Sequence, residues 1–313
     1  MEFLAQYGMF ILKSFTIVFA ILFLTAGIFA ISKKPKSKIN ISYLNKHYDD
    51  LKNSIEKVVF KKKSKKSKKS KTDDHTSYTY LIDFEGDIKA SQVAALREEV
   101  SAILSVVTPK DEVIVKIESH GGTVNGYGLA ASQLQRIRDK GIPLTVCIDK
   151  IAASGGYLMA CVANKILAAP FAIIGSIGVV AQLPNFHRFL QKNNIDVELI
   201  TAGEYKRTLT VFGKNTDKGR QKFQEDLDEI HQVFIDHILA NRSQLNIEEV
   251  ATGEHWLAKD AIGLNLIDKL QTSDEYIIEK ISSSKAYKVS AETKQNMLNK
   301  LLNPAMKLIH PFA

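Results

Sequence analysis

Ser154 is the residue of this sequence best placed for covalent chemistry. It lies in Ala152-Ala-Ser-Gly-Gly-Tyr157, where a predicted strand over 143–148 leads into an apolar helix that reaches Val162. A serine at a tight strand-to-helix turn presents its hydroxyl to a substrate, while the amides at the helix start face the same point. A plain helix N-cap is the competing interpretation, and the local sequence taken alone favours it.

A second glycine turn, Ser119-His-Gly-Gly122, follows a predicted buried strand over 112–117. In a parallel sheet both turns can lie at the same strand edge, where sites gather. The amides of Gly121 and Gly122 could then face a developing oxyanion, and losing one such donor typically costs about 2.7–4 kcal/mol. His120 invites a Ser–His triad as an alternative, but no aspartate is evidently placed to orient it.

The elements that must position these turns alternate between strand and helix. We predict strands over 78–84, 112–117, 143–148 and 165–168, and helices over 90–107, 126–138 and 217–245. This rhythm is typical of a layered α/β domain. The uncharged run 166–183 is interpreted as two short buried strands around a Gly-Ser turn, because Pro170 and two glycines interrupt it.

The N-terminal part of the chain has a different composition. Residues 14–31 carry no charge, which predicts a transmembrane anchor within 1–32. A cleavable signal peptide fits worse, because Glu2 is present and an early basic cluster is not. Residues 33–76 are predicted to be a Lys-rich linker, disordered around KKKSKKSKKSK at 61–71 and attracted to anionic lipid.

The net charge of +8 comes from that linker. Residues 33–71 hold 15 lysines against three acids, so the remaining chain is slightly acidic. No nucleic-acid partner is therefore expected for the folded body. Cys147 and Cys161 lie in apolar surroundings and are interpreted as small buried hydrophobic residues.

Several short motifs, taken together, resemble the S49 (signal peptide peptidase) family of serine peptidases, and within it the branch anchored in the inner membrane. They cover about residues 78–270 in the family's order. The motifs are Ser119-His-Gly-Gly122, Ala152-Ala-Ser-Gly-Gly-Tyr157, Ala163-Asn-Lys-Ile-Leu-Ala168, Gly175-Ser-Ile-Gly-Val179, Thr201-Ala-Gly-Glu-Tyr-Lys-Arg-Thr208 and Thr252-Gly-Glu-His-Trp256. We expect a catalytic domain over 77–272 and a C-terminal extension over 273–313.

The resemblance implies a ClpP/crotonase-like fold and a Ser/Lys dyad. The nucleophile falls on Ser154 and the general base on Lys206, with an oxyanion amide from the Gly121–Gly122 turn. Ser176 occupies the position at which other members of the family have a serine that hydrogen-bonds the lysine amine. His120 occupies a position at which many members have proline. A lysine is a base only when neutral, so its pKa must fall from ~10.4 toward ~7–8, which burial can achieve.

The implied function is that of a membrane-anchored serine endopeptidase acting on signal-peptide-like or membrane-protein-derived peptides. It would be a homo-oligomer in which a neighbour could complete the site, and no cofactor or metal is expected. The alternatives are a non-proteolytic membrane scaffold and a crotonase-like acyl-CoA enzyme. The implied location is a bacterial inner membrane, crossed once by the anchor. The catalytic domain could then lie on either the cytoplasmic or the periplasmic side. The lysines after the anchor favour the cytoplasm, whereas the family analogy favours the periplasm.

Overall fold

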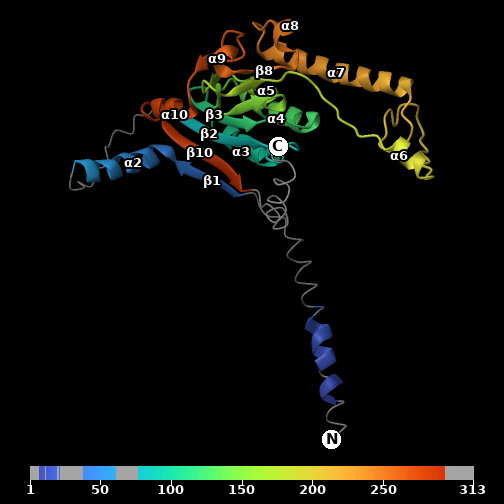
Figure 1. Cartoon of the computed structure of the whole chain (residues 1–313). Coiled ribbons are helices and arrows are strands. Elements are labelled where there is room, and N and C mark those ends of the chain that lie inside the picture. The colour runs from blue at the N-terminus through green and yellow to red at the C-terminus, as the bar shows by residue number, and fades with distance from the viewer. Residues whose placement is uncertain (1–6, 11, 20, 22–37, 61–76, 293–313) are drawn as a thin grey trace. The chain divides into compact units, whose positions relative to one another are not determined.

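The computed structural model describes residues 7–10, 12–19, 21, 38–60 and 77–292. The chain divides into two units, of which the larger comprises residues 39–292 (Figure 1). The predicted basic run 61–71 and residues 293–313 of the predicted C-terminal extension lie outside the described residues.

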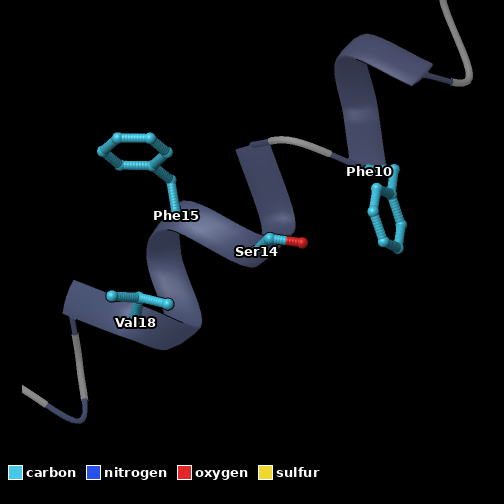
Figure 2. Close-up of a pocket in the computed structure, with 4 residues that line it drawn as sticks. All are labelled: Phe10, Ser14, Phe15 and Val18. Atoms are coloured by element: carbon cyan, nitrogen blue, oxygen red, sulfur yellow. The ribbon is translucent and has the colours of Figure 1, made fainter.

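The described residues of the N-terminal unit are helical at 7–10, 12–19 and 21. Phe10, Ser14, Phe15 and Val18 line an open hollow on this segment (Figure 2). Within the described part of the chain, no helix has both the length and the apolar character needed to cross a bilayer. The predicted span 14–31 lies largely outside that part.

The larger unit is built on a sheet to which ten strands of the described residues contribute, in the order β1-β10-β2-β3-β4-β6-β9. Strand β5 pairs with β3 and β7, and β7 pairs with β8. The strands are β1 (Lys38–Tyr43), β2 (Tyr78–Gly86), β3 (Glu112–Ser119), β4 (Leu144–Ile148), β5 (Ile151–Ala153), β6 (Lys165–Ala168), β7 (Ile173–Gly175), β8 (His255–Leu257), β9 (Lys269–Leu270) and β10 (Lys285–Glu292).

Helices cover both faces of this sheet, which confirms the predicted α/β class. They are α2 (Leu44–Val59), α3 (Val93–Leu104), α4 (Val124–Asp139), α5 (Gly155–Ala160), α6 (His187–Lys192), α7 (Asp217–Asn241), α8 (Ile247–Val250), α9 (Ala258–Ala261) and α10 (Ser273–Ile281). Thr216 caps α7 by accepting the Gly219 N–H, and Thr272 with Glu275 forms a capping box on α10.

Side chains of the central strands point alternately to the two faces of the sheet and so contribute to two separate hydrophobic cores. Ile82, Val115 and Val146 join the large core on the side of α3, α4 and α5. Their neighbours on the opposite face join a small core with Tyr276 and Ile277 of α10, namely Leu81, Ile114, Cys147 and Leu167. Because both faces are covered, these strands read as continuous apolar runs, as expected for a parallel sheet.

The sheet extends beyond the predicted domain limits of 77–272. Strand β10 pairs in parallel with β2, with Tyr287 opposite Tyr80, and β1 lies outside β10 at the sheet edge. Residues 38–59, which we assigned to the linker, form β1 and α2. The sequence of β10, KAYKVSAE, mixes polar and apolar residues. Its pairing with β2 could therefore not be recognised from the sequence.

An ion pair between a buried arginine and a partly exposed aspartate joins the end of α7 to the β6–β9 region. The Arg242 guanidinium donates to both Asp268 carboxylate oxygens at 2.9 and 3.1 Å, and Asp268 also accepts the Ile166 N–H at 2.7 Å. The Arg242 side chain is 3% exposed. Removing only one partner of such a pair leaves a buried charge without compensation.

We therefore expect Asp268→Leu to lower the free energy of unfolding by about 3–5 kcal/mol. In a thermal melt of the detergent-solubilised chain this corresponds to a Tm decrease on the order of 10 °C. The double variant Arg242→Met/Asp268→Leu is the matched control and should recover much of the loss, because it leaves no unpaired charge. A single variant that melts with the wild type would contradict this role of the pair.

Candidate active site

Three parallel strands bring the predicted site turns to one edge of the sheet. Ser119 of β3 lies opposite Ala152 of β5, and Ala153 lies opposite Gly175 of β7. The Gly121–Gly122 turn, Ser154 and Ser176 therefore follow neighbouring strands at the same edge. Strand β5 was not predicted, because it has only three residues and follows β4 almost at once.

Ser154 has the backbone of a strained strand-to-helix turn. Its φ is 51° and its ψ is −118°, and its side chain makes no capping hydrogen bond with α5. A positive φ costs a residue with a side chain on the order of 1–3 kcal/mol, and such strain is common at functional sites. The Ser154 N–H donates to the Gly175 carbonyl at 2.8 Å, which ties the turn to β7. Ser154 is therefore the N-cap residue of α5 by position, but its hydroxyl does not cap the helix.

Gly121 lies directly against this turn. A Cβ on Gly121 would come within 2.8 Å of both the Gly155 nitrogen and the Ser154 Cβ, and the φ of Gly121 is +91°. Only glycine combines this backbone with so close an approach. The predicted oxyanion turn and the predicted nucleophile are therefore in contact.

The Ser119–Gly122 turn and the Ser154–Gly155 turn together form the Ser154 corner. Its backbone N–H groups differ in whether they already donate a hydrogen bond. The Gly121 N–H donates to the Ser119 hydroxyl at 3.0 Å. Among the described residues, the N–H groups of Gly122 and Gly155 have no acceptor. We expected the amides at this helix start to face the site, but we did not name Gly155 as a donor from the sequence.

A buried hydroxyl pair supports the turn from below. The Ser119 and Tyr127 hydroxyls are 2.5 Å apart, and the Tyr127 hydroxyl donates to the Asp87 carbonyl at 2.9 Å. Burial raises the pKa of Tyr127, so this phenol stays protonated. The Tyr127 ring also lies against Gly155, where an added Cβ would be 2.4 Å from it. We did not predict a role for either side chain from the sequence.

Ser176 carries a positive φ of 54°, and its N–H donates to the Glu254 carbonyl at 2.6 Å. The preceding Gly175 faces the Trp256 ring, which an added Cβ would approach to 2.8 Å. His120 is exposed, and within the described part of the chain it makes no hydrogen bond with Ser154. The contacts of His120 therefore lend the Ser–His triad no support.

Lys206 lies in a different region from this corner. It is exposed, and its segment is held by a Glu204–Lys218 ion pair of 2.6 Å and by Phe186, whose N–H donates to the Val211 carbonyl. Figure 1 shows α6 and the segment that follows it beside the N-terminal end of α7, away from α5. Across the described ranges, no hydrogen bond joins Lys206 to Ser154 or Ser176.

The two cysteines lie outside this corner. Burial raises the pKa of Cys147 and that of Cys161 to about 12, and both thiols are free. They are the small buried residues that we predicted.

Comparison with known proteins identifies the family to which this geometry belongs. Residues 136–288 match the profile "Peptidase family S49", and residues 2–134 match "Peptidase family S49 N-terminal". "Probable protease SohB" of Haemophilus influenzae is 51% identical over 245 residues, which cover 77% of this chain and 69% of that protein. The chain belongs to peptidase family S49. As a member of this family it is a protease, and the scaffold and acyl-CoA alternatives are not favoured.

Another relative matches this S49 peptidase along almost its whole length. "Probable protease SohB" of Buchnera aphidicola subsp. Schlechtendalia chinensis is 46% identical, over 90% of this chain and 100% of that protein. Among solved structures, the 1510-N membrane-bound stomatin-specific protease in complex with a substrate peptide aligns with a TM-score of 0.44 and 14% identity. That alignment covers 74% of this chain and 98% of the other.

Helix α7 of the S49 peptidase contacts the helix that follows Ser154. His237 lies 3.2 Å from the Leu158 carbonyl of α5. A carbonyl only accepts, so His237 Nε2 carries the proton of a neutral ring. Burial lowers the pKa of His237, and its hydrogen bond with Leu158 only partly opposes this.

This histidine predicts a pH dependence of stability. The unfolded chain takes up a proton on His237 near pH 6.5, whereas the folded chain does so only at lower pH. Stability should therefore fall as the pH drops below about 6.5, and should stop falling below the folded-state pKa. Melting curves of wild type and His237→Gln at several pH values test this. The difference between the two proteins should change with pH, and a constant difference would contradict the prediction.

Proposed function

We propose that this chain is a serine endopeptidase in which Ser154 is the nucleophile and Lys206 the general base. The observation that carries the proposal is the strained Ser154 turn, which lies against Gly121 and whose hydroxyl makes no capping hydrogen bond. A ClpP/crotonase-like version of the α/β fold is part of the proposal. It is supported by the parallel strands whose ends form the site.

In this mechanism Ser154 Oγ attacks the scissile carbonyl carbon and passes its proton to the neutral Lys206 amine. The N–H groups of Gly155 and Gly122 are the proposed donors to the oxyanion, since neither has another acceptor within the described residues. Collapse of the tetrahedral intermediate forms the acyl-enzyme and releases the amine, which takes the proton from Lys206. A water activated by Lys206 then hydrolyses the ester.

The Ser119–Tyr127 hydroxyl pair should act on rate through the oxyanion turn. We expect Tyr127→Phe to lower kcat about tenfold with little change in KM, because a misplaced donor weakens the transition state more than substrate binding. Tyr157→Phe is a matched control. Tyr157 is equally buried, and its hydroxyl donates to the Leu266 carbonyl at 2.9 Å, a different part of the body.

Steady-state kinetics of wild type, Tyr127→Phe and Tyr157→Phe should show the rate defect in the first variant only. Tyr127→Phe loses two buried hydrogen bonds and Tyr157→Phe loses one, so both variants should lose about 1–3 kcal/mol of stability, with the larger loss in Tyr127→Phe. Equal kcat values in the two variants would show that the Tyr127 hydroxyl does not act on the reaction rate through the oxyanion turn.

We further propose that Lys206 reaches Ser154 from a neighbouring copy in a homo-oligomer. Two observations support this: the exposed position of Lys206, and the apolar side chains along the same stretch of chain. Val180 and Ile200 are 91% and 90% exposed, and Phe189, Tyr205 and Phe212 are also exposed. Surfaces of this kind mark protein contacts. Burial in such a contact would favour the neutral amine that the mechanism needs.

The proposed setting is a bacterial inner membrane, with the chain anchored through residues 14–31 and attracted to anionic lipid by the lysines of 33–76. The uncharged run supports this, as do the apolar side chains exposed on the helical residues before Ile21. The proposed substrates are signal-peptide-like or membrane-protein-derived peptides. The charge rule and the family analogy predict opposite faces for the body, and a compartment-specific reporter fused after Ala313 distinguishes them.

An acylating serine-reactive probe tests the nucleophile and its base in the detergent-solubilised full chain. Wild type should be labelled, whereas Ser154→Ala and Lys206→Ala should not. Equal labelling of all three proteins would exclude the dyad. If wild type stays unlabelled while its size matches that of the oligomer, Ser154 is not an activated nucleophile.

A further inference from the structure

Helix α2 is attached to the body only through its first turns. The Asn45 side-chain amide donates to the carbonyls of Ile281 and Ser284 at 2.9 Å, and its oxygen accepts the Ala286 N–H at 2.8 Å. Leu44 and Tyr48 pack against the small core beside α10. No residue of α2 is buried, and the helix runs outward from the sheet (Figure 1).

An apolar stripe continues along the part of α2 that leaves the body. Leu51, Ile55, Val58 and Val59 are between 50% and 79% exposed. Their spacing places them on one helix face, which is also the face of Leu44 and Tyr48. Four adjacent large apolar side chains in water are unfavourable, so this stripe requires a partner.

The sequence on both sides of α2 identifies the chemistry of that partner. Four lysines lie within 33–38 before the helix and eight within 61–71 after it. Each lysine near an anionic bilayer contributes about 1 kcal/mol to binding. Two copies of the chain meeting at this helix would instead bring the two lysine runs of each copy together, and like charges repel. An anionic bilayer can bury the apolar stripe among its acyl chains and attract the lysines with its headgroups.

We propose that the outer half of α2 lies in the headgroup region of an anionic bilayer, with Leu51, Ile55, Val58 and Val59 facing the acyl chains. An amphipathic helix in this position buries its apolar face about 5–10 Å into the interface. The proposal rests on the membrane location proposed above, but not on the peptidase chemistry. Because Asn45 ties α2 to β10 and α10, the helix would also hold the sheet at a set orientation to the lipid surface.

The test uses the full chain with one added cysteine on α2, labelled with an environment-sensitive fluorophore. The native Cys147 and Cys161 are buried, which directs the label to the new thiol. Ile55→Cys reports the apolar stripe, and Asn53→Cys on the opposite helix face is the matched control. Each protein is reconstituted into vesicles that contain phosphatidylglycerol, or phosphatidylcholine alone, with brominated acyl chains as quencher.

We expect bromolipid to quench the label at Ile55 at least about threefold more than the label at Asn53, and chiefly in the anionic vesicles. Equal quenching at both positions, or none at Ile55, would overturn the proposal. A shielded label at Ile55 that bromolipid does not reach would mean that protein covers the stripe, which also overturns it. Co-flotation with the vesicles reports the anchor separately, and probe labelling of Ser154 reports the proposed activity.

Discussion

Neither Ser154→Ala nor Lys206→Ala should hydrolyse peptides alone, but the two variants expressed together should regain activity. Loss of either member of the dyad should lower kcat on the order of 10⁴-fold or more. If each site takes its serine from one copy and its lysine from the next, random mixing restores about one quarter of the sites, because half of each donor is intact. The exposed position of Lys206 and its separation from the Ser154 corner motivate this expectation.

The measurement is peptide hydrolysis by complexes purified through different tags on the two variants. Ser154→Ala expressed with the double variant Ser154→Ala/Lys206→Ala is the control, and it should remain inactive since no intact serine is present. Inactive mixed complexes that contain both single variants would show that serine and lysine come from the same chain. This result would keep Ser154 as the proposed nucleophile and Lys206 as the proposed base. It would exclude only the proposal that Lys206 comes from a neighbouring copy.

Replacing Gly121 by alanine should lower kcat about 10³-fold, even though no catalytic side chain is changed. The new Cβ would meet the Gly155 nitrogen and the Ser154 Cβ at 2.8 Å and the Ala153 carbonyl oxygen at 2.9 Å. These atoms belong to the backbone or lie next to it, so the two turns must separate. A displacement near 1 Å can cost about 10²-fold, and a lost oxyanion donor about 10²–10³-fold.

Gly128→Ala is the matched control for this substitution. An added Cβ on Gly128 of α4 meets nothing within 4 Å, and alanine is the better helix former by about 0.5–1 kcal/mol. This variant should keep wild-type kcat and melt at the same temperature or slightly higher. Both proteins are compared after size exclusion, using the fractions that elute where wild type does. Gly121→Ala activity within about threefold of wild type would contradict the contact between the turns.

The alternation of the central strands and helices between residues 78 and 168, and the turns that carry Ser154, Gly121 and Gly122, could be predicted from the sequence. Strands covered on both faces are continuous apolar runs, and glycine turns after them are local signals. These patterns depend on neighbours along the chain. The local signal did not separate a nucleophile from an N-cap at Ser154, since both use a serine before glycines at a helix start. The folded structure adds that the Ser154 φ is 51° and that its hydroxyl makes no capping hydrogen bond with α5.

Local signals also failed where the partner is distant along the chain. Strand β5 has three residues and takes its identity from β3 and β7, and β10 is recognisable only beside β2. The contact between the Ser119 and Tyr127 hydroxyls, which supports the glycine turn, could not be predicted from the sequence. Sequence motifs alone paired Lys206 with Ser154, whereas the folded chain holds Lys206 beside α7.

By itself, therefore, the sequence determined the fold class, the glycine turns and the motifs of an S49 peptidase, because each is written in neighbouring residues. The tertiary structure alone decided which amides remain free at the Ser154 corner, what supports the Gly121 turn and which face of α2 is left uncovered. Those properties arise from atoms that meet only when distant segments pack. A lysine's exposure or a glycine's closest contact has no counterpart in the linear chain.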